Sequence, residues 1–333
     1  MRWSAKRPQE RPGPEESPRT EPPAQAPEST LVEFTEPAAV APGSKPILLH
    51  ALDGFLSAGA APRLAAEHLI GEGGEPASRR GTTVATFDID RLLDYRARRP
   101  GMVFDQDHYS RYETPSLTVR LLTDETDRPY LLLAGPEPDF RWEGFIDAVV
   151  SVIDRFDVSL TVGLGAVPMG VPHTRPAVVT SHATKPSLLD RTNLWRGQLV
   201  VPASASALLE FRLGQQGYDA LGYVAHVPHY LAQVEFPSAA VTLLEVIAAR
   251  TGLSFDLDPL RSKAVEAQVD IDRQITDQDA HEVVTGLEQA YDAFTRGADS
   301  SLLAQDGEIP DAEELGRQVE QFLAGLDRRD DRD

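Results

Sequence analysis

Gly163-Leu-Gly-Ala-Val-Pro-Met-Gly-Val-Pro-His-Thr-Arg-Pro176 is a segment rich in Gly and Pro that lies between two strand-like runs. Val158-Ser-Leu-Thr-Val162 precedes it, and Ala177-Val-Val-Thr180 follows it. Glycine admits a positive φ and proline fixes φ near about −65°, so such a segment needs a particular backbone path. Loops held at strand ends are where α/β proteins place functional groups. We therefore expect a loop over 163–176 whose polar side chains include His173 and Arg175.

Strand-like and helix-like segments alternate on both sides of this loop. Pro129-Tyr-Leu-Leu-Leu-Ala134 is apolar throughout, as expected of a strand covered on both faces. The helix expected after it carries one apolar stripe, formed by Trp142, Phe145, Ile146, Val149, Val150 and Ile153. The alternation predicts an α/β fold with a mostly parallel mixed sheet and helices on both faces. The segments 116–122 and 129–134 are separated by a turn-like Asp-Glu-Thr-Asp-Arg, which indicates one antiparallel pair.

Composition divides the chain into four expected parts. Residues 1–44 are dense in Pro, Glu, Arg and Ser, so their burial cannot offset the ordering entropy and we expect a disordered tail. Residues 45–257 carry the alternating pattern of the α/β core domain. Residues 258–297 show only helical patterns, beginning at Asp258-Pro259, and are expected to form a helical extension. Residues 298–333 form an acidic tail, expected to be partly helical or disordered.

Charge and cysteine content exclude several classes of function. The 32 Lys and Arg against 52 Asp and Glu give a net charge of −20, which disfavours binding to nucleic acid and to anionic membranes. The absence of cysteine excludes disulfides, thiolate nucleophiles and cysteine-ligated zinc. No apolar run reaches the ~18 residues of a membrane span, and the N-terminus lacks a signal-peptide core. We therefore expect a cytoplasmic protein without membrane or nucleic-acid partners.

Polar residues follow several of the expected strands, and parallel strands end at one edge of a sheet. The candidate ligand-binding residues at this edge are Asp53, Gly135, His173, Arg175, His226 and His229. His and Arg bind anions, and His moves protons near neutral pH, so one interpretation is a crevice for a nucleoside or phosphorylated ligand. The other interpretation is that these groups bind loop backbone and fix subunit contacts.

Signatures of catalysis, metal binding and cofactor binding are missing. No nucleophile is paired with a base, so we assign no catalytic residue. Pro228 separates His226 from His229, and no carboxylate stands at a metal-ligand spacing, so we expect no metal. The GxGxxG, P-loop, GxSxG and HExxH patterns are absent, and we expect no cofactor. The basic run Arg96-Ala-Arg-Arg99 suits a solvated or ion-paired surface, with an acidic partner or nucleic acid as the alternative.

Four segments in order carry a resemblance to a known family. They are 162–176 with its Pro-His-Thr-Arg-Pro end, Phe87-Asp-Ile-Asp-Arg-Leu-Leu-Asp-Tyr-Arg96 followed by Arg99-Pro100, Leu133-Ala-Gly-Pro-Glu-Pro138, and Val227-Pro-His-Tyr-Leu231. Over residues 45–295 the chain resembles a bacterial branch of the proteasome assembly chaperone family, second-subunit type. The resemblance implies a three-layer α/β/α sandwich similar in topology to purine nucleoside phosphorylases. It also implies a homo-oligomer, such as a small ring or a trimer.

The same resemblance implies a kind of partner. Eukaryotic family members help to assemble the proteasome core, and some archaeal relatives bind it through a C-terminal hydrophobic–Tyr–any-residue tail. This chain ends in Asp331-Arg332-Asp333, so we do not expect docking through such a tail. We expect a non-enzymatic, oligomeric assembly-chaperone-like or scaffolding protein, with itself and proteasome-related proteins as partners. The open alternative is a binding protein or enzyme for a nucleoside or phosphorylated small molecule at the strand-end crevice.

Overall fold

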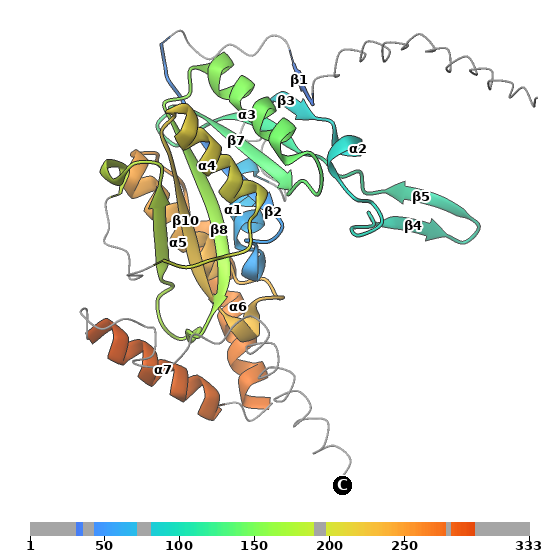
Figure 1. The fold of residues 1–333 in the computed structure, drawn as a ribbon. Coiled ribbons are helices and arrows are strands. Elements are labelled where there is room, and N and C mark those ends of the chain that lie inside the picture. The colour runs from blue at the N-terminus through green and yellow to red at the C-terminus, as the bar shows by residue number, and fades with distance from the viewer. Residues whose placement is uncertain (1–30, 36–42, 72–80, 190–197, 278–280, 297–333) are drawn as a thin grey trace, which may run out of the picture. The chain divides into compact units, whose positions relative to one another are not determined.

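An eight-stranded mixed sheet forms the centre of the fold (Figure 1). The computed structural model describes residues 31–35, 43–71, 81–189, 198–277 and 281–296. The strand order is β1-β3-β6-β7-β2-β8-β10-β9. These strands are β1 (Val32–Phe34), β2 (Ile47–Asp53), β3 (Thr82–Phe87), β6 (Thr118–Thr123), β7 (Pro129–Pro136), β8 (Leu160–Met169), β9 (Val179–Ala183) and β10 (Ala220–Pro228).

The four central strands, β7, β2, β8 and β10, run parallel, and the strands on either side are antiparallel to their neighbours. The mixed α/β sheet is therefore confirmed, with a larger antiparallel part than the sequence indicated. The expected antiparallel pair is β6 with β7. Its turn is held by Asp124, whose Oδ1 accepts hydrogen bonds from the backbone N–H groups of Thr126 (2.8 Å) and Arg128 (2.9 Å).

Helices cover both faces of this sheet and complete the three layers. Leu49 and Ala51 of β2 face the layer of α1 and α5, and Leu48 and Leu52 face the layer of α3 and α4. Because both faces are buried, β2 shows a continuous apolar run instead of alternation. The helices are α1 (Ala61–Ile70), α2 (Ile89–Leu92), α3 (Trp142–Phe156), α4 (Ala205–Gln216), α5 (Pro237–Thr251), α6 (Asp258–Asp277) and α7 (His281–Arg296), with short 3-10 turns η1 (Ala58–Ala60), η2 (Pro186–Leu188) and η3 (His229–Leu231).

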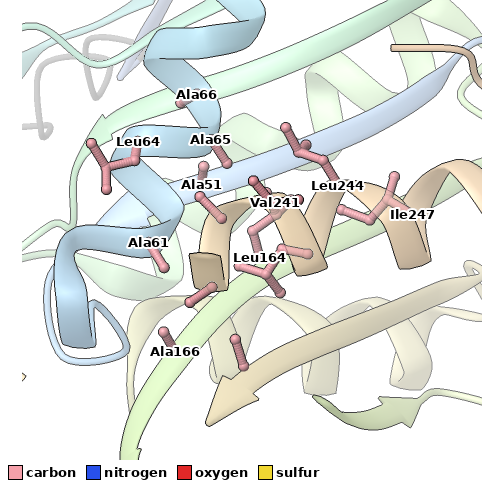
Figure 2. Packing of buried hydrophobic residues seen from close by; sticks show 14 of the residues in the cluster. Ala51, Ala61, Leu64, Ala65, Ala66, Leu164, Ala166, Val241, Leu244 and Ile247 are labelled. Carbon is pink, nitrogen blue, oxygen red and sulfur yellow. The ribbon is translucent and has the colours of Figure 1, made fainter. Parts of the chain in front are cut away.

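Small side chains let α1 approach the sheet closely (Figure 2). Ala61 and Ala65 of α1 are fully buried, and they share one core cluster with Ala51 of β2 and with Leu244 and Ile247 of α5. Burial of each Leu or Ile side chain in such a cluster contributes about 1.5–3 kcal/mol. This packing fixes α1 and α5 over the parallel strands and so determines where the loops after those strands emerge.

Helix α6 extends the helical layer formed by α1 and α5. Helix α6 begins at Asp258, as the sequence predicted, and packs against α5. Leu260 and Ile271 of α6 are buried in the cluster that contains α1 and α5. The tail 298–333 lies outside the described residues. Within the described ranges, no helix combines the length and the apolarity that crossing a membrane requires.

Part of the segment expected to be disordered is ordered in the structure. Within 1–44, strand β1 pairs antiparallel with β3 at the edge of the sheet. Leu31 and Val32 are buried, and the Arg155 guanidinium lies 4.5 Å from the centre of the Phe34 ring. The prediction of disorder is wrong for this run because its apolar side chains complete the core beside α3. Residues 1–30 and 36–42 are not among those described.

The first half of the segment 163–176, which we predicted to be a loop, belongs to strand β8. Strand β8 continues to Met169, because β10 pairs with it in parallel from Ala220↔Thr161 to Pro228↔Met169 and gives its backbone groups hydrogen-bond partners. Gly163, Gly165 and Gly170 do not use the positive φ that glycine admits. The connection from β8 to β9 is therefore only 170–178.

Candidate functional site

Asp53, Gly135 and His173 lie at or beyond the carboxyl ends of parallel strands. The parallel register places Asp53 opposite Pro136, and Pro228 opposite Met169. Strands β8 and β10 continue past the point where β2 stops pairing with β8 at His50. The residues of this edge therefore form two groups, one around Asp53 and one around His173.

The first group surrounds an open depression of about 450 Å³. It is lined by Asp53, Gly54, Phe55, Arg98, Pro136 and Glu137. Only Asp53 among these was predicted as a site residue. Gly135, which precedes Pro136, has φ 142°, and a Cβ there would lie 2.2 Å from the carbonyl oxygen of Ser116. Glycine is therefore needed at position 135 because the backbone at Ser116 passes too close to leave room for a side chain.

Glu137 connects the segment after β2 to the start of α4. Its carboxylate is buried, with Oε2 accepting a hydrogen bond from the Phe55 N–H (2.7 Å) and Oε1 accepting one from the Ala205 N–H (2.6 Å). The second contact places a negative charge at the N-terminus of α4, where the helix dipole favours it. A Cβ at Gly54 would lie 2.0 Å from Glu137 Oε2, so glycine is required there.

Arg98 lines the same depression and contacts three of its neighbouring residues. Its guanidinium donates to the carbonyl oxygens of Glu137 (2.7 Å) and Asp53 (3.3 Å), and it pairs with the carboxylate of Asp139. Asp139 also accepts a hydrogen bond from the Asp94 N–H (2.8 Å). For Arg98, the ion-paired interpretation of the basic run therefore fits. The arginine joins the ends of β2 and β7 to the segment after α2.

The second group is built around His173, whose side chain is 1% exposed. Its backbone N–H donates to the Tyr230 hydroxyl (3.0 Å), and its Nδ1 lies 2.6 Å from the same oxygen. Its Nε2 lies 3.0 Å from Asp272 Oδ1 of α6. All three contacts are satisfied when Tyr230 donates to Nδ1 and the protonated Nε2 donates to Asp272. His173 thus links η3 to α6.

Arg175 makes the matching contact with α7. Its Nε and Nη2 donate to the two carboxylate oxygens of Asp292, each at 2.9 Å, and its Nη1 lies 3.1 Å from Glu288 Oε1. The hydrogen bonding that Arg175 donates to Asp292 is the main cause that raises the pKa of Arg175. Tyr291 of α7 adds a hydrogen bond to the Pro176 carbonyl oxygen (2.9 Å). The loop after β8 therefore holds α7 through a bidentate ion pair, the strongest geometry for Arg with a carboxylate.

The two other predicted histidines do not join a common pocket. His226 lies inside β10, is 2% exposed, and contacts Thr180 Oγ1 through Nε2 (2.9 Å). His229 is exposed at the start of η3, with its ring 5.4 Å from that of Tyr230. Across the described part of the chain, no three His, Cys, Asp or Glu side chains are grouped to hold a metal ion.

A row of two histidines and two glycines crosses the sheet on the α4 side, and the sequence did not indicate it. The register aligns His50 of β2, Gly163 of β8, Gly222 of β10 and His182 of β9. A Cβ on Gly163 would lie 2.8 Å from the His50 ring, and one on Gly222 would lie 2.3 Å from the His182 ring. The glycines are therefore needed to make room for imidazoles. His182 Nδ1 contacts Glu210 of α4 at 2.9 Å.

Burial favours the neutral form of His50 and of His226. It lowers the pKa of His50 to about 4, with a smaller contribution from the nearby His182, and it lowers the pKa of His226 to about 4. The Nδ1 atoms of both rings are buried and have no hydrogen-bond partner among the residues described. A charged imidazole in either place would lose its hydration without gaining a compensating contact.

Several residues that build the site were missed from the sequence. Glu137 and Tyr230 lie in quoted segments, one after β7 and one beside His229, so their place at strand ends was visible. Glu288 and Asp292 have the i, i+4 spacing of one helix face. Nothing in the sequence indicated that this acidic face would meet Arg175.

Fold and site together define a three-layer α/β protein whose strand-end loop is bound to its own C-terminal helices. The model of the PAC2 family matches residues 51–275 of the chain. This chain belongs to the PAC2 family. No curated protein matches it.

Solved structures with the same fold include proteins of Mycobacterium tuberculosis and Corynebacterium glutamicum. The Mycobacterium tuberculosis unknown function protein Rv2714 is 42% identical, with a TM-score of 0.76 over 82% of this chain and 95% of that one. A protein of unknown function from Corynebacterium glutamicum is 34% identical, with a TM-score of 0.73 over 80% and 98%. The Mycobacterium tuberculosis proteasome-assembly chaperone homologue Rv2125 is 26% identical, with a TM-score of 0.62 over 69% and 95%. The likeness to Rv2125 supports the resemblance found in the sequence.

Arg175→Gln is expected to loosen α7, because it removes the paired donors that hold Asp292 and Glu288. In hydrogen–deuterium exchange, amides of His281–Arg296 should exchange several-fold faster, while those of β2 and β8 keep their protection. The control is Arg273→Gln, since Arg273 pairs with Asp270 of its own helix. Unchanged exchange in α7 of the Arg175 variant would contradict the assigned clamp.

The free energy of unfolding is expected to fall as the pH drops from about 6.5 to about 4. The pKa values of His50 and His226 are about 4 in the folded protein and an ordinary 6.5 in the unfolded chain. Between these pH values the unfolded chain therefore binds more protons than the folded protein, and a fall in pH favours unfolding. The difference between folded and unfolded pKa values corresponds to a loss of roughly 3 kcal/mol in the free energy of unfolding per histidine when the pH has fallen below both values. Urea unfolding at stepped pH would measure it.

The double variant His50→Asn/His226→Asn should flatten this pH dependence, and the exposed His229→Gln should leave it unchanged. If the double variant and the wild type lost stability equally between these pH values, the two imidazoles would have to titrate normally in the folded protein.

Proposed function

We propose that this chain is a non-enzymatic, oligomeric assembly-chaperone-like protein that binds itself and proteasome-related proteins. Membership of the PAC2 family supports the proposal, as does the 26% identity to a protein described as a proteasome-assembly chaperone homologue. The observation that carries it is the pairing of His173 and Arg175 with the chain's own C-terminal helices. These side chains act as structural ties between a strand-end loop and α6 and α7.

Catalysis requires a side chain that can reach a substrate and exchange a proton with it. Both ring nitrogens of His173 already have partners in the chain, and its side chain is almost wholly buried. The Arg175 guanidinium is directed at two carboxylates of α7. The groups that suggested chemistry in the sequence therefore support a rigid framework better than an active site.

The net charge of −20 supports the same class of function and describes the partner surface. A strongly acidic chain attracts basic protein surfaces over long range and repels anionic ligands. Attraction of this kind speeds encounter and weakens as salt screens it. A proteasome-related partner would accordingly present a basic patch to this chain.

Copurification from the source cell tests the proposal. The tagged full chain should retain proteasome core subunits or their precursors, identified by mass spectrometry, several-fold above an unrelated tagged acidic protein. The retained amount should fall at raised salt, because the contact is expected to be electrostatic. Absence of every proteasome-related protein above the control would overturn the proposal.

One observation favours a second candidate, the binding of a small molecule. The depression lined by Asp53, Phe55, Arg98 and Glu137 has a volume of about 450 Å³, which is within the usual range for ligand sites. Its electrostatics oppose the phosphorylated ligand first considered. Arg98 donates to Asp139 and to two backbone carbonyls, and two carboxylates line the same space.

Thermal-shift measurements with inorganic phosphate and with nucleosides are expected to give no change in Tm. A site whose arginine is already occupied offers little differential affinity for the folded chain. A stabilisation that Arg98→Gln removes and His229→Gln retains would favour the small-molecule function instead.

A further inference from the structure

The β4–β5 hairpin carries an apolar face that nothing in the described chain covers. Strands β4 (Met102–Asp105) and β5 (His108–Tyr112) form a two-stranded sheet of their own (Figure 1). Every residue of both strands is exposed. The four most exposed large apolar side chains of the hairpin are those of Met102 (53% exposed), Phe104 (60%), Tyr109 (68%) and Tyr112 (47%), and Val103 is less exposed (37%).

A β-bulge gathers these four side chains on one face. Directly opposite residues share a face, and the register pairs Met102 with Tyr112 and Phe104 with Tyr109. Tyr109 and Tyr112 are three residues apart and would point to opposite faces in a regular strand. The register shift between these pairs leaves Ser110 as the extra residue and restores both tyrosines to one side. The Phe104 and Tyr109 rings stack edge to face at 5.2 Å.

The opposite face of the hairpin is polar. The register pairs Val103 with Arg111 and Asp105 with His108, so the charged side chains and the histidine of the two strands lie there beside Val103. The ribbon is therefore amphipathic, although both of its faces are open. A two-stranded hairpin without a covering layer is marginally stable in water, so the apolar face favours an added layer.

Charge identifies a second copy of this chain as the occupant. Two copies with a net charge of −20 repel one another wherever their carboxylates meet. The face formed by Met102, Phe104, Tyr109 and Tyr112 has no carboxylate, so two copies can touch there without bringing acidic groups together. Identical faces are also self-complementary, because apolar surface meets apolar surface across a two-fold axis.

The area of this face sets the expected strength of the contact. An aromatic side chain buries about 150–250 Å², so three half-exposed rings and a methionine offer on the order of 400 Å² per copy. Two stacked ribbons would bury roughly 800 Å² in total, which is below the ~1,200 Å² of stable interfaces. A dimer formed through this face alone would be weak and would depend on concentration.

We propose that the apolar face of the β4–β5 hairpin is a self-association surface, on which the same face of a second copy stacks. This inference deepens the self-association included in the proposed function and rests on it. Stacking completes two layers of β-ribbon, with the four apolar side chains of each copy between them. Salt should strengthen this contact, because screening reduces the repulsion between the acidic copies. Salt should weaken the contact with a basic partner.

Sedimentation of the full chain over a concentration series tests the surface. The wild type should rise above monomer mass, more so at raised salt, and Phe104→Ser/Tyr109→Ser should weaken association at least tenfold. The matched control is Val103→Ser/Arg111→Ser on the polar face, which should associate as the wild type does.

Cross-linking identifies the contact face directly, since the chain contains no cysteine. Tyr109→Cys treated with a short flexible bismaleimide should give a covalent dimer, and Arg111→Cys should remain monomeric. A wild type that stays monomeric at every concentration would overturn this inference and the self-association, and would leave binding of a proteasome-related partner standing. An oligomeric wild type that Phe104→Ser/Tyr109→Ser does not weaken would overturn the hairpin surface alone.

Discussion

The parallel pairing of β8 with β10 is the constraint on which the rest of the structure depends. It runs without a break from Thr161 to Met169 and carries both strands past the end of the β2–β8 ladder. The connection that leaves β8 therefore starts beyond the other strand ends and reaches α6 and α7. The same register sets Gly163 and Gly222 side by side, which leaves room for the rings of His50 and His182 on the α4 face. One ladder thus determines both the position of the outer loop and the packing beneath α4.

Electrostatic ties convert this edge into a framework. Glu137 joins the ends of β2 and β7 to α4, and Arg98 reinforces the same junction from the side. His173 and Arg175 join the loop after β8 to the two C-terminal helices. Arg98, His173 and Arg175 each contact a carboxylate, which offsets part of the repulsion in a chain with so many acidic groups. The matched groups are held in fixed positions, a property that suits a protein that presents surfaces to partners.

The two kinds of surface on this molecule suit different contacts. The acidic exterior disfavours close approach of identical copies and favours basic proteins. The β4–β5 ribbon is an apolar exception whose four side chains are brought to one face by a single bulge. The proposed self-association and the proposed partner binding should therefore respond to salt in opposite directions, because repulsion limits the first and attraction drives the second.

The sequence by itself determined the layered α/β architecture, since the apolar run at Pro129–Ala134 and the single stripe of α3 report burial on both faces and on one face, respectively. It also placed Asp53, Gly135 and His173 near the carboxyl ends of parallel strands, although Asp53 and Gly135 are still part of β2 and β7, and it carried the family resemblance. It could not show that β8 continues to Met169, because periodicity reports burial, whereas strand length depends on a partner distant in sequence. Only the tertiary structure decided what Arg175 and His173 contact, since Asp292 and Asp272 lie about a hundred residues away along the chain. Ion pairs of this kind are set by the packing of α6 and α7, and no local pattern encodes them.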